Sequence, residues 1–463
     1  MATGISGTST GSTGLDVASL VTQLVAAERA PDDKRLTRAD AKLTTQLTAV
    51  SQLKGGLSAF QGALASLKDV SSYIVRNVAL SDTSSLSASA SSAAAQGGYD
   101  VEVLQLAKAA QLGSAAFAGG STSVVGTGTL LISMGSNGFT VNIDSSNNTL
   151  AGIRDAINAA TTNTGVQATL LTGTAGSKLV LTGSQTGATN AITVSVNGGD
   201  GGLSQLSYSP STPLTNGLSV IQAAQDASIK VSGFAVTSAT NTVTNAIDGV
   251  TLNLLKATPG TTTNVSVSND TGTVQSRING FVSAFNTLEK QIASLRAYDP
   301  ATQKAGPMLG DAMLNGIEAQ LRRILSAPVA GANGSYTTLA SLGITSGLDG
   351  TLSVDATKLQ KALAAGTTMV SGVFGGPNGV ATKLSEYLTA QLANTGQIAA
   401  RNDSISRQQK SLQAQKDALN ARMAVIQSRY QTQFSALDTM LQKMQSTSSY
   451  LAQQLSNLSS NNK

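Results

Sequence analysis

The sequence predicts an α+β multidomain protein in which N- and C-terminal helices form coiled-coil legs and β-rich head domains are inserted between them. Apolar residues recur every seven positions near both ends of the 463-residue chain, which is the spacing by which one helix packs along another. Between these ends the period falls to two, as in strands joined by turns. Cysteine is absent, so the fold depends on helix packing and sheet burial without disulfides.

The first arm starts with helical spacing from residue 15 to residue 30, with Asp16 near the N-cap. We expect Pro31 to interrupt this helix, because it lacks an N–H donor and disfavours a helical residue before it. Gly55 and Gly56 indicate either the close approach of a neighbour or a soft helix, since each costs about 1 kcal/mol relative to Ala. The heptad positions of this arm are Leu36, Leu43, Val50, Leu57 and Leu64, with companions Ala39, Leu53, Phe60 and Leu67 and the polar exception Gln46.

The middle of the chain consists of short alternating runs such as GTLLISM, FTVNI and AITVSV, bounded by Gly, Asn and Ser, which predicts a series of strands. Residues 149–160 form the one stretch here with the periodicity of a helix. The sequence GTAGSK at 173–178 is better explained as a hairpin turn than as a phosphate-binding loop. Ser177 separates its glycine from its lysine, and a strand follows where a phosphate loop would open a helix.

Helical spacing returns after residue 273 and continues to about residue 400. Asp349 and Gly350 predict a hairpin-type turn, and Asp355 is expected to cap the helix that follows. Arg322 and Arg323 are interpreted as a solvated helix face, with recognition of an acidic partner as the alternative.

The last arm has the same pattern as the first, because its apolar residues are again seven positions apart, and it can therefore supply the partner helix. Gln433, Thr447 and Gln454 fall on its seam, so its repeat drifts. Amphipathic helices of a globular core also carry apolar stripes, but strict repeats at both ends favour an extended coil formed by the two arms or by neighbouring copies. The seam positions are Ile405, Leu412, Leu419 and Ile426, continued by Leu437, Met444 and Leu451.

These patterns divide the chain into six parts. They are an N-terminal leg segment (1–35), an N-terminal coiled-coil helix (36–78), an inner β-rich head domain (79–114 and 220–272), an outer β-rich head domain (115–219), an α-rich domain (273–400), and C-terminal coiled-coil and leg helices (401–463).

The composition argues against an enzyme, and no catalytic, cofactor or metal site is predicted. Without His or Cys there is no Ser-His-Asp triad, no Cys nucleophile and no zinc site of the usual ligand types. Ser51 and Lys54 match a Ser-x-x-Lys spacing, but they lie within the coil seam and lack the companion motifs of that enzyme class. Asp32 and Asp33 are interpreted as the acidic first turn of a helix, where they complement the macrodipole.

The charge distribution gives no sign of nucleic-acid binding. The net charge is +5, yet residues 86–270 carry five Lys and Arg against eight Asp and Glu, and no concentrated basic face is visible. The opening MATGISGTSTGSTGLDV lacks the pattern of a Sec signal peptide, and no stretch is apolar enough to span a membrane. We therefore expect that an exported form would leave the cell by another route.

Several stretches, in this order, resemble the flagellar hook-associated protein 2 family. GLDVASLVTQLVAAERAP is similar to its N-terminal signature, and the segment from LAGIRDAINAA to GSQTGATNAITV is similar to its flagellin-hook repeat motif. NTVTNAIDGVTLNLL resembles another recurrent stretch of the family. YTTLASLGITSGLDGTLSVD and FSALDTMLQKMQSTSSYLAQQL resemble its C-terminal signatures.

The resemblance implies a secreted, axial flagellar protein, exported unfolded, that forms a ring-shaped homo-oligomer at the filament tip. The terminal helices would be legs reaching into the filament, and incoming flagellin would fold and insert beneath the β-rich plate. Implied partners are flagellin, the hook–filament junction protein and an export chaperone at the C-terminal helices, and the family is also associated with adhesion. The alternatives are a hook–filament junction protein and a secreted adhesin or glycan-binding module built on the β-rich middle.

Overall fold

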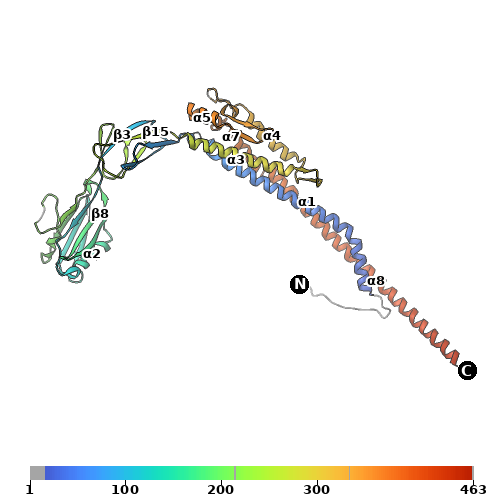
Figure 1. Ribbon diagram of the computed structural model, residues 1–463. Helices are drawn as coiled ribbons and strands as arrows, with labels where there is room; N and C mark the ends of the chain where they lie inside the picture. The colour runs from blue at the N-terminus through green and yellow to red at the C-terminus, as the bar shows by residue number, and fades with distance from the viewer. Residues whose placement is uncertain (1–15, 213–214, 333, 461–463) are drawn as a thin grey trace. The chain divides into compact units, whose positions relative to one another are not determined.

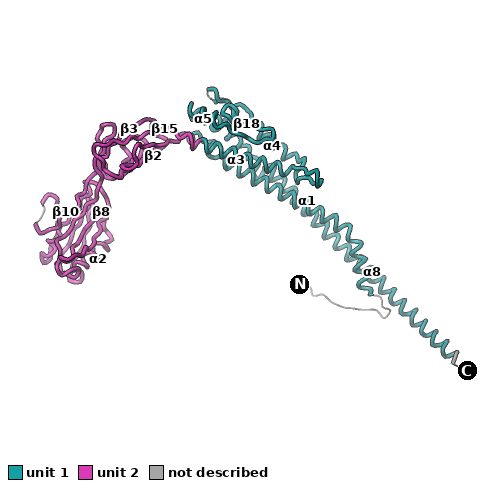
Figure 2. Tube along the Cα trace, in the orientation of Figure 1, with its two compact units in different colours: residues 1–70, 275–463 teal, residues 71–274 magenta. Residues whose placement is uncertain are grey.

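The computed structural model describes residues 16–212, 215–332 and 334–460. The chain forms two compact units, one from residues 1–70 and 275–463 and the other from residues 71–274 (Figure 2). The predicted α+β class is confirmed, because a long N-terminal helix packs against a long C-terminal helix and the β-sheets lie between them in the sequence.

Two long helices dominate the first unit and lie side by side (Figure 1): α1, Val17–Lys68, and α8, Gln397–Ser460. Asp16 caps α1 as predicted, because its carboxylate accepts a hydrogen bond from the backbone N–H of Ser19 at 3.0 Å.

The interruption expected at Pro31 does not occur, since α1 runs through this residue. A proline inside a helix costs about 3 kcal/mol. Pro31 lies on the exposed side of α1. Val21 and Leu36 are buried before and after it, and their packing holds the helix in one piece.

Helix α1 also ends earlier than the predicted boundary at residue 78. Its last buried position is Leu67, and the backbone becomes extended at Asp69. The heptad repeat places Ser71 at the next seam position, so a further turn would gain no apolar burial there.

The rest of the first unit is a helical domain packed on the C-terminal half of α1. The ring of Phe60 on α1 contacts two rings of the next long helix, α3. Its centroid lies 5.8 Å from that of Phe281 and 5.6 Å from that of Phe285, and Phe374 contacts Phe281 edge-on. The elements of this domain are α3 (Thr271–Arg296), β16 (Tyr298–Asp299), β17 (Lys304–Ala305), α4 (Ala312–Ser326), β18 (Ile344–Ser346), β19 (Leu352–Val354), α5 (Ala356–Ala365), α6 (Thr367–Phe374) and α7 (Val380–Leu392).

Two short-range predictions are confirmed in this domain. Asp349 and Gly350 lie in the turn between β18 and β19, where Gly350 has a positive φ of 84°. Asp355 caps α5 by accepting a hydrogen bond from the backbone N–H of Lys358 at 3.1 Å.

The second unit contains two hydrophobic cores, each enclosed by two antiparallel sheets. The first core lies between a five-stranded sheet, in the order β1-β15-β3-β11-β12, and a three-stranded sheet, β13-β14-β2. Val101, Ile229 and Leu252 are among its fully buried side chains. The strands are β1 (Arg76–Leu80), β2 (Leu86–Ala90), β3 (Gly97–Gln105), β11 (Ala227–Val231), β12 (Phe234–Ser238), β13 (Thr242–Ile247), β14 (Val250–Leu254) and β15 (Thr262–Asn269).

The second core lies between the sheets β10-β4-β8-β7 and β6-β5-β9 and is also covered by helix α2, Leu150–Ala159, which Thr149 caps. Leu130, Ile153 and Leu181 are buried in it. The predicted helix at 149–160 is thus confirmed. The strands are β4 (Ala109–Gly113), β5 (Gly128–Met134), β6 (Asn137–Ile143), β7 (Val166–Gly173), β8 (Gly176–Thr186), β9 (Ile192–Asn197) and β10 (Ser219–Gln222).

The boundaries between the two cores differ from the predicted boundaries between the head domains. We expected β4 and β10 to belong to the inner head domain, at 79–114 and 220–272. They pair instead with β8 and with each other in the second core, where Leu112 is buried. Strand pairing between distant segments sets this boundary, and the alternation within each strand does not reveal it.

Gly56 allows α3 to approach α1 closely. A Cβ built on Gly56 would lie 2.1 Å from Oε1 of Gln291 and 3.2 Å from a methyl carbon of Leu288, whereas one on Gly55 would meet nothing within 4 Å. The Nε2 group of Gln291 donates to the backbone carbonyl of Gln52 at 2.8 Å. The close-approach alternative therefore explains Gly56.

We predict that Gly56→Leu lowers the free energy of unfolding of the first unit by about 1–3 kcal/mol, because the new side chain overpacks the contact with α3. Gly55→Leu is the matched control and should raise it by up to about 0.8 kcal/mol through helix propensity alone. Urea unfolding followed by helical circular dichroism measures both. Equal effects of the two substitutions would contradict the close packing at Gly56.

Candidate assembly interface

Helices α1 and α8 are antiparallel, and polar contacts beside their apolar seam fix the register. Tyr430 donates to Glu28 at 3.1 Å, Arg29 donates to Asn420 at 2.7 Å, and Lys416 donates to Asp40 at 3.0 Å. The α8 partner numbers fall as the α1 numbers rise. Sequence reasoning missed these pairs, although opposite charges beside a heptad seam are their usual signal.

The structure buries the central part of the predicted seam on both helices. The buried positions are Leu36, Leu43 and Val50 on α1, and Ile405, Leu412, Leu419 and Ile426 on α8. Val21 on α1, which is also buried, extends the apolar contact toward the start of α1, and Met423 is buried between Leu419 and Ile426 on α8.

The C-terminal heptads of α1 pack in the helical domain. Leu57 and Leu64 are fully buried, and the antiparallel register places Leu57 level with the start of α8 at Gln397 and Leu64 beyond it. Helix α7 takes over as neighbour there, and Gln61 donates to Thr389 of α7 at 2.8 Å. One apolar stripe thus serves a two-helix coil in its first half and a globular core in its second.

The opposite end of the seam has no partner among the described residues. Helix α1 starts at Val17, while α8 continues past it as a single helix (Figure 1). The predicted seam residues of this segment are exposed: Leu437 by 46%, Met444 by 61% and Leu451 by 55%. The structure therefore does not bring them together with the first arm.

A shift in the apolar repeat accompanies this change. Two four-residue steps in succession, from Ile426 to Tyr430 and on to Phe434, rotate the stripe around α8. After the shift, apolar residues follow one another at alternating steps of three and four, and Ser448 occupies one position of this stripe. Gln433, Thr447 and Gln454 lie outside the shifted stripe, which explains why the seven-residue count met polar residues there. The residues of this distal stripe are Phe434, Leu437, Leu441, Met444, Leu451 and Leu455.

Other residues singled out by sequence have structural roles. Ser51 and Lys54 are exposed on α1, as expected for helix surface. Asp32 and Asp33 are not in a first turn, because α1 starts earlier; they pair with arginines of the same helix, Arg35 and Arg29. The hairpin interpretation of GTAGSK is confirmed by the pairing of Gly173 with Gly176 between β7 and β8.

Arg322 has a structural role that its interpretation as a solvated side chain missed. Its guanidinium pairs with Glu289 at 2.6 Å and with Glu318, two carboxylates that are 3% and 7% exposed. Arg296 pairs with Glu318 as well. Because buried carboxylates need compensating charges, this network ties α3 to α4, while Arg323 stays exposed. Burial raises the pKa of Glu289 despite the hydrogen bond from Arg322, and the nearby Glu318 carboxylate raises it further.

The described part of the chain offers neither a metal site nor a membrane span. No group of three or more acidic side chains there is placed to hold a metal ion. None of the helices within the described ranges is both long and apolar enough to cross a bilayer.

Comparison with known families covers most of the chain. Residues 13–110 match the family described as "Flagellar hook-associated protein 2 N-terminus", and residues 224–446 match "Flagellar hook-associated protein 2 C-terminus". Residues 129–185 match the "Flagellin hook IN motif", which covers strands and helix α2 of the second core.

Relatives and a solved structure agree with these matches. The B-type flagellar hook-associated protein 2 of Pseudomonas aeruginosa is 34% identical over 454 residues, 95% of each chain. The flagellar hook-associated protein 2 of Escherichia coli is 34% identical over 460 residues, 96% of this chain and 97% of the relative. A crystal structure of the flagellar cap protein FliD from Escherichia coli superposes with a TM-score of 0.66 at 33% identity, covering 77% of this chain and 99% of that one.

The burial difference along α8 predicts a difference in stability. Leu412→Ala should lower the free energy of unfolding by about 2–4 kcal/mol, because it opens a cavity in the seam. Leu451→Ala should change it by less than about 0.5 kcal/mol, because this side chain is exposed among the described residues. Chemical denaturation of the purified variants measures both. A large loss from Leu451→Ala would mean that the distal stripe is already covered.

The pKa of Glu289 predicts a pH dependence. A carboxyl group whose pKa is raised by folding contributes stability below its ordinary pKa and loses it as the pH rises through the native value. Glu289→Gln removes this titration, so raising the pH from 5 to 7.5 should lower the stability of the wild type relative to this variant. Helical circular dichroism in urea at both pH values measures the difference.

Asp349→Asn is the control for this experiment, because Asp349 stays ionised from pH 5 to 7.5 and its replacement should leave no such trend. Hydrogen bonds from Thr351 lower the pKa of Asp349, so its contribution is present at neutral pH and is lost as the pH falls through the native value. The same pH trend for both variants would contradict the assignment of the raised pKa to Glu289.

Proposed function

We propose, from the premise that the chain belongs to the flagellar hook-associated protein 2 family, that helices α1 and α8 act as the legs of an oligomeric filament cap. The protein is a structural component of the flagellar filament cap, is extracellular and is not an enzyme. Matches to both the N- and C-terminal parts of the family favour the cap over the alternative of a hook–filament junction protein.

The observation that carries the proposal is the distal stripe of α8, whose Leu437, Met444, Leu451 and Leu455 are exposed, together with the paired seam that precedes it on the same helix. A row of apolar side chains open to water is a common mark of a surface that binds a partner. Residues 1–15 do not supply an equivalent row, because Met1, Ala2, Ile5 and Leu15 are their only apolar members. Helices of neighbouring subunits are therefore the occupants that fit this stripe, and each leg would be completed by assembly.

The composition of the legs suits a cap that must move as the filament grows. A tight interface usually depends on buried Trp, Tyr and Arg side chains. The chain has no Trp and 3% aromatic residues, and the distal stripe is flanked mostly by Gln, Ser and Thr. Contacts of this kind are individually weak and repeatable, so a leg can be released and bound again while flagellin subunits fold and insert beneath the cap.

The remaining expectations follow from the same proposal. The second unit, with its two sheet-enclosed cores, would form the plate that prevents loss of flagellin from the tip. Flagellin and the hook–filament junction protein would contact the legs, and an export chaperone would cover the C-terminal part of α8 before secretion. A role in adhesion stays a prediction, as does the alternative of a glycan-binding module on the β-rich middle.

The direct test replaces Leu43 and Leu412 with Asn. Each substitution places a polar amide in the buried seam, so the legs should separate and filaments should be shorter than in the wild type. Electron microscopy of cells carrying the variant measures filament length, and microscopy of the purified protein distinguishes rings or plates from monomers. Thr45→Asn, an exposed change on the same helix, is the control. Normal filaments together with normal rings would count against a role of the seam.

A further inference from the structure

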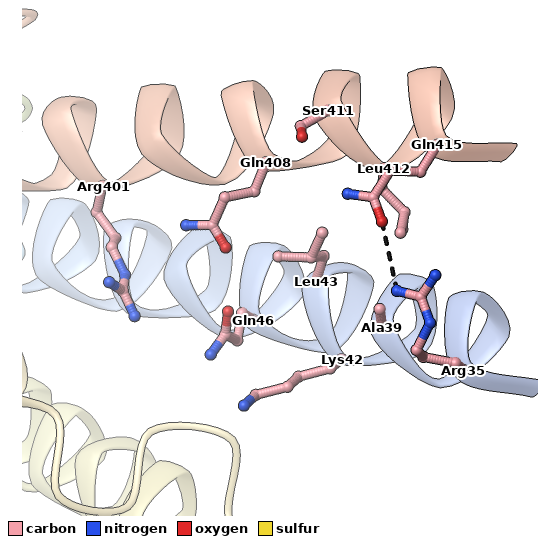
Figure 3. A pocket seen from close by; sticks show the side chains of 10 residues that line it. All are labelled: Arg35, Ala39, Lys42, Leu43, Gln46, Arg401, Gln408, Ser411, Leu412 and Gln415. Atoms are coloured by element: carbon pink, nitrogen blue, oxygen red, sulfur yellow. Dashed lines mark hydrogen bonds between the residues drawn. The ribbon is translucent and has the colours of Figure 1, made fainter. Parts of the chain in front are cut away.

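The α1–α8 seam contains a cationic hollow that the proposed leg function does not yet explain. It has a volume of about 500 Å³ and is open to solvent. Its floor consists of Leu43 and Leu412, and the small side chain of Ala39 leaves the space above them. In Figure 3, Arg401, Gln408 and Gln415 extend from α8 toward α1, and Arg35 meets Gln415 at the other end.

The lining of this cationic hollow carries three positive charges and no carboxylate. The charges belong to Arg35, Lys42 and Arg401, and amide groups of Gln46, Gln408 and Gln415 lie between them. Lys42 also lines a second hollow of about 350 Å³ beside Gly306 and Pro307.

Carboxylates of the described residues compensate the three cations of the hollow to different extents. Lys416 is paired with Asp40 at 3.0 Å and Arg29 with Asp33 at 2.7 Å. Lys42, in contrast, makes no hydrogen bond or ion pair with the described residues, and Arg35 reaches Asp32 at 3.4 Å. Arg401 is paired with Asp311 at 3.2 Å through one nitrogen and keeps further donors.

We propose that this cationic hollow binds an acidic protein segment of a neighbouring subunit, whose carboxylates pair with Lys42, Arg35 and Arg401. The inference rests on the proposed function, in which the legs contact other subunits. Guanidinium groups bind carboxylates through paired hydrogen bonds, and the amides would hold the segment's backbone. The apolar floor gives a protein segment side-chain contacts that a free inorganic anion does not use.

The lining favours a protein over a nucleic acid. Proteins that bind single strands combine a positive groove with aromatic side chains on which bases stack, and the hollow has no aromatic residue in its lining. The whole first unit carries 24 Lys and Arg against 16 Asp and Glu, which would steer an acidic partner toward the legs.

The test measures binding of a fluorescein-labelled peptide of ten glutamates to the full chain by fluorescence anisotropy. Lys42→Glu should weaken binding by about fivefold or more, the effect of losing one ion pair and adding a repulsive one. Lys54→Glu is the matched control, because Lys54 is an exposed lysine of the same helix outside the hollow. It should weaken binding less than twofold, about the size of a general charge effect. Circular dichroism confirms that both variants keep their helices.

Three results would overturn the proposal. The first is that the wild type does not bind the peptide, and the second is that both variants lose the same amount of affinity for it. The third is that a ten-nucleotide thymidine strand binds as tightly as the peptide and is weakened as much by Lys42→Glu. The last two results would mean general attraction of polyanions. The proposed leg function is tested separately, by the variant that carries both Leu43→Asn and Leu412→Asn. If that variant makes normal filaments while Lys42→Glu loses peptide binding, the leg function is contradicted and the binding role of the hollow is supported.

Discussion

The structure of the first unit depends on the antiparallel contact between the two ends of the chain. Lys416 and Asp40 are paired although 376 residues separate them in the sequence. Closing so long a loop costs entropy, but this cost grows only with the logarithm of loop length. The second unit has two hydrophobic cores that use no residue of either long helix, and a compact insertion shortens the stretch of chain that has to be closed.

The register of that contact decides which side chains of each helix find a partner. Because α8 begins at Gln397, the last heptads of α1 extend past it and enter the aromatic cluster around Phe60. Because α1 begins at Val17, the last part of α8 extends past it in the other direction and keeps Met444 and Leu451 exposed. The offset between the two helices thus places the end of α1 in the helical domain and leaves the end of α8 as a single helix with exposed apolar residues.

Local and periodic features were predictable from the sequence, because nearby residues determine them. The cap at Asp16, the helix at 149–160, the hairpin at 173–178 and the central heptads of the two arms are of this kind. Features that depend on distant contacts were not. Continuation of α1 through Pro31 needs the burial on either side of it.

The same limit applies to the other features that sequence reasoning missed. The buried partners of Arg322 lie on another helix as well as its own, and the place of β4 in the second core depends on strands far along the chain. The shift of the apolar stripe at Tyr430 can be found in the sequence. A strict seven-residue count does not detect it, because two successive four-residue steps break that count.

The difference between the two halves of the seam has a consequence for specificity. Inside the α1–α8 contact, ion pairs such as Lys416 with Asp40 flank the apolar row and fix a single register. The distal stripe has few charges beside it, Asp438 and Lys443 among the residues from 434 to 457, so little there would select one partner or one register. A helix of this kind can pack on several helices of similar shape in turn. The paired part of the leg then supplies a fixed geometry, and the unpaired part supplies contacts that can be exchanged, which is what a cap on a growing filament requires.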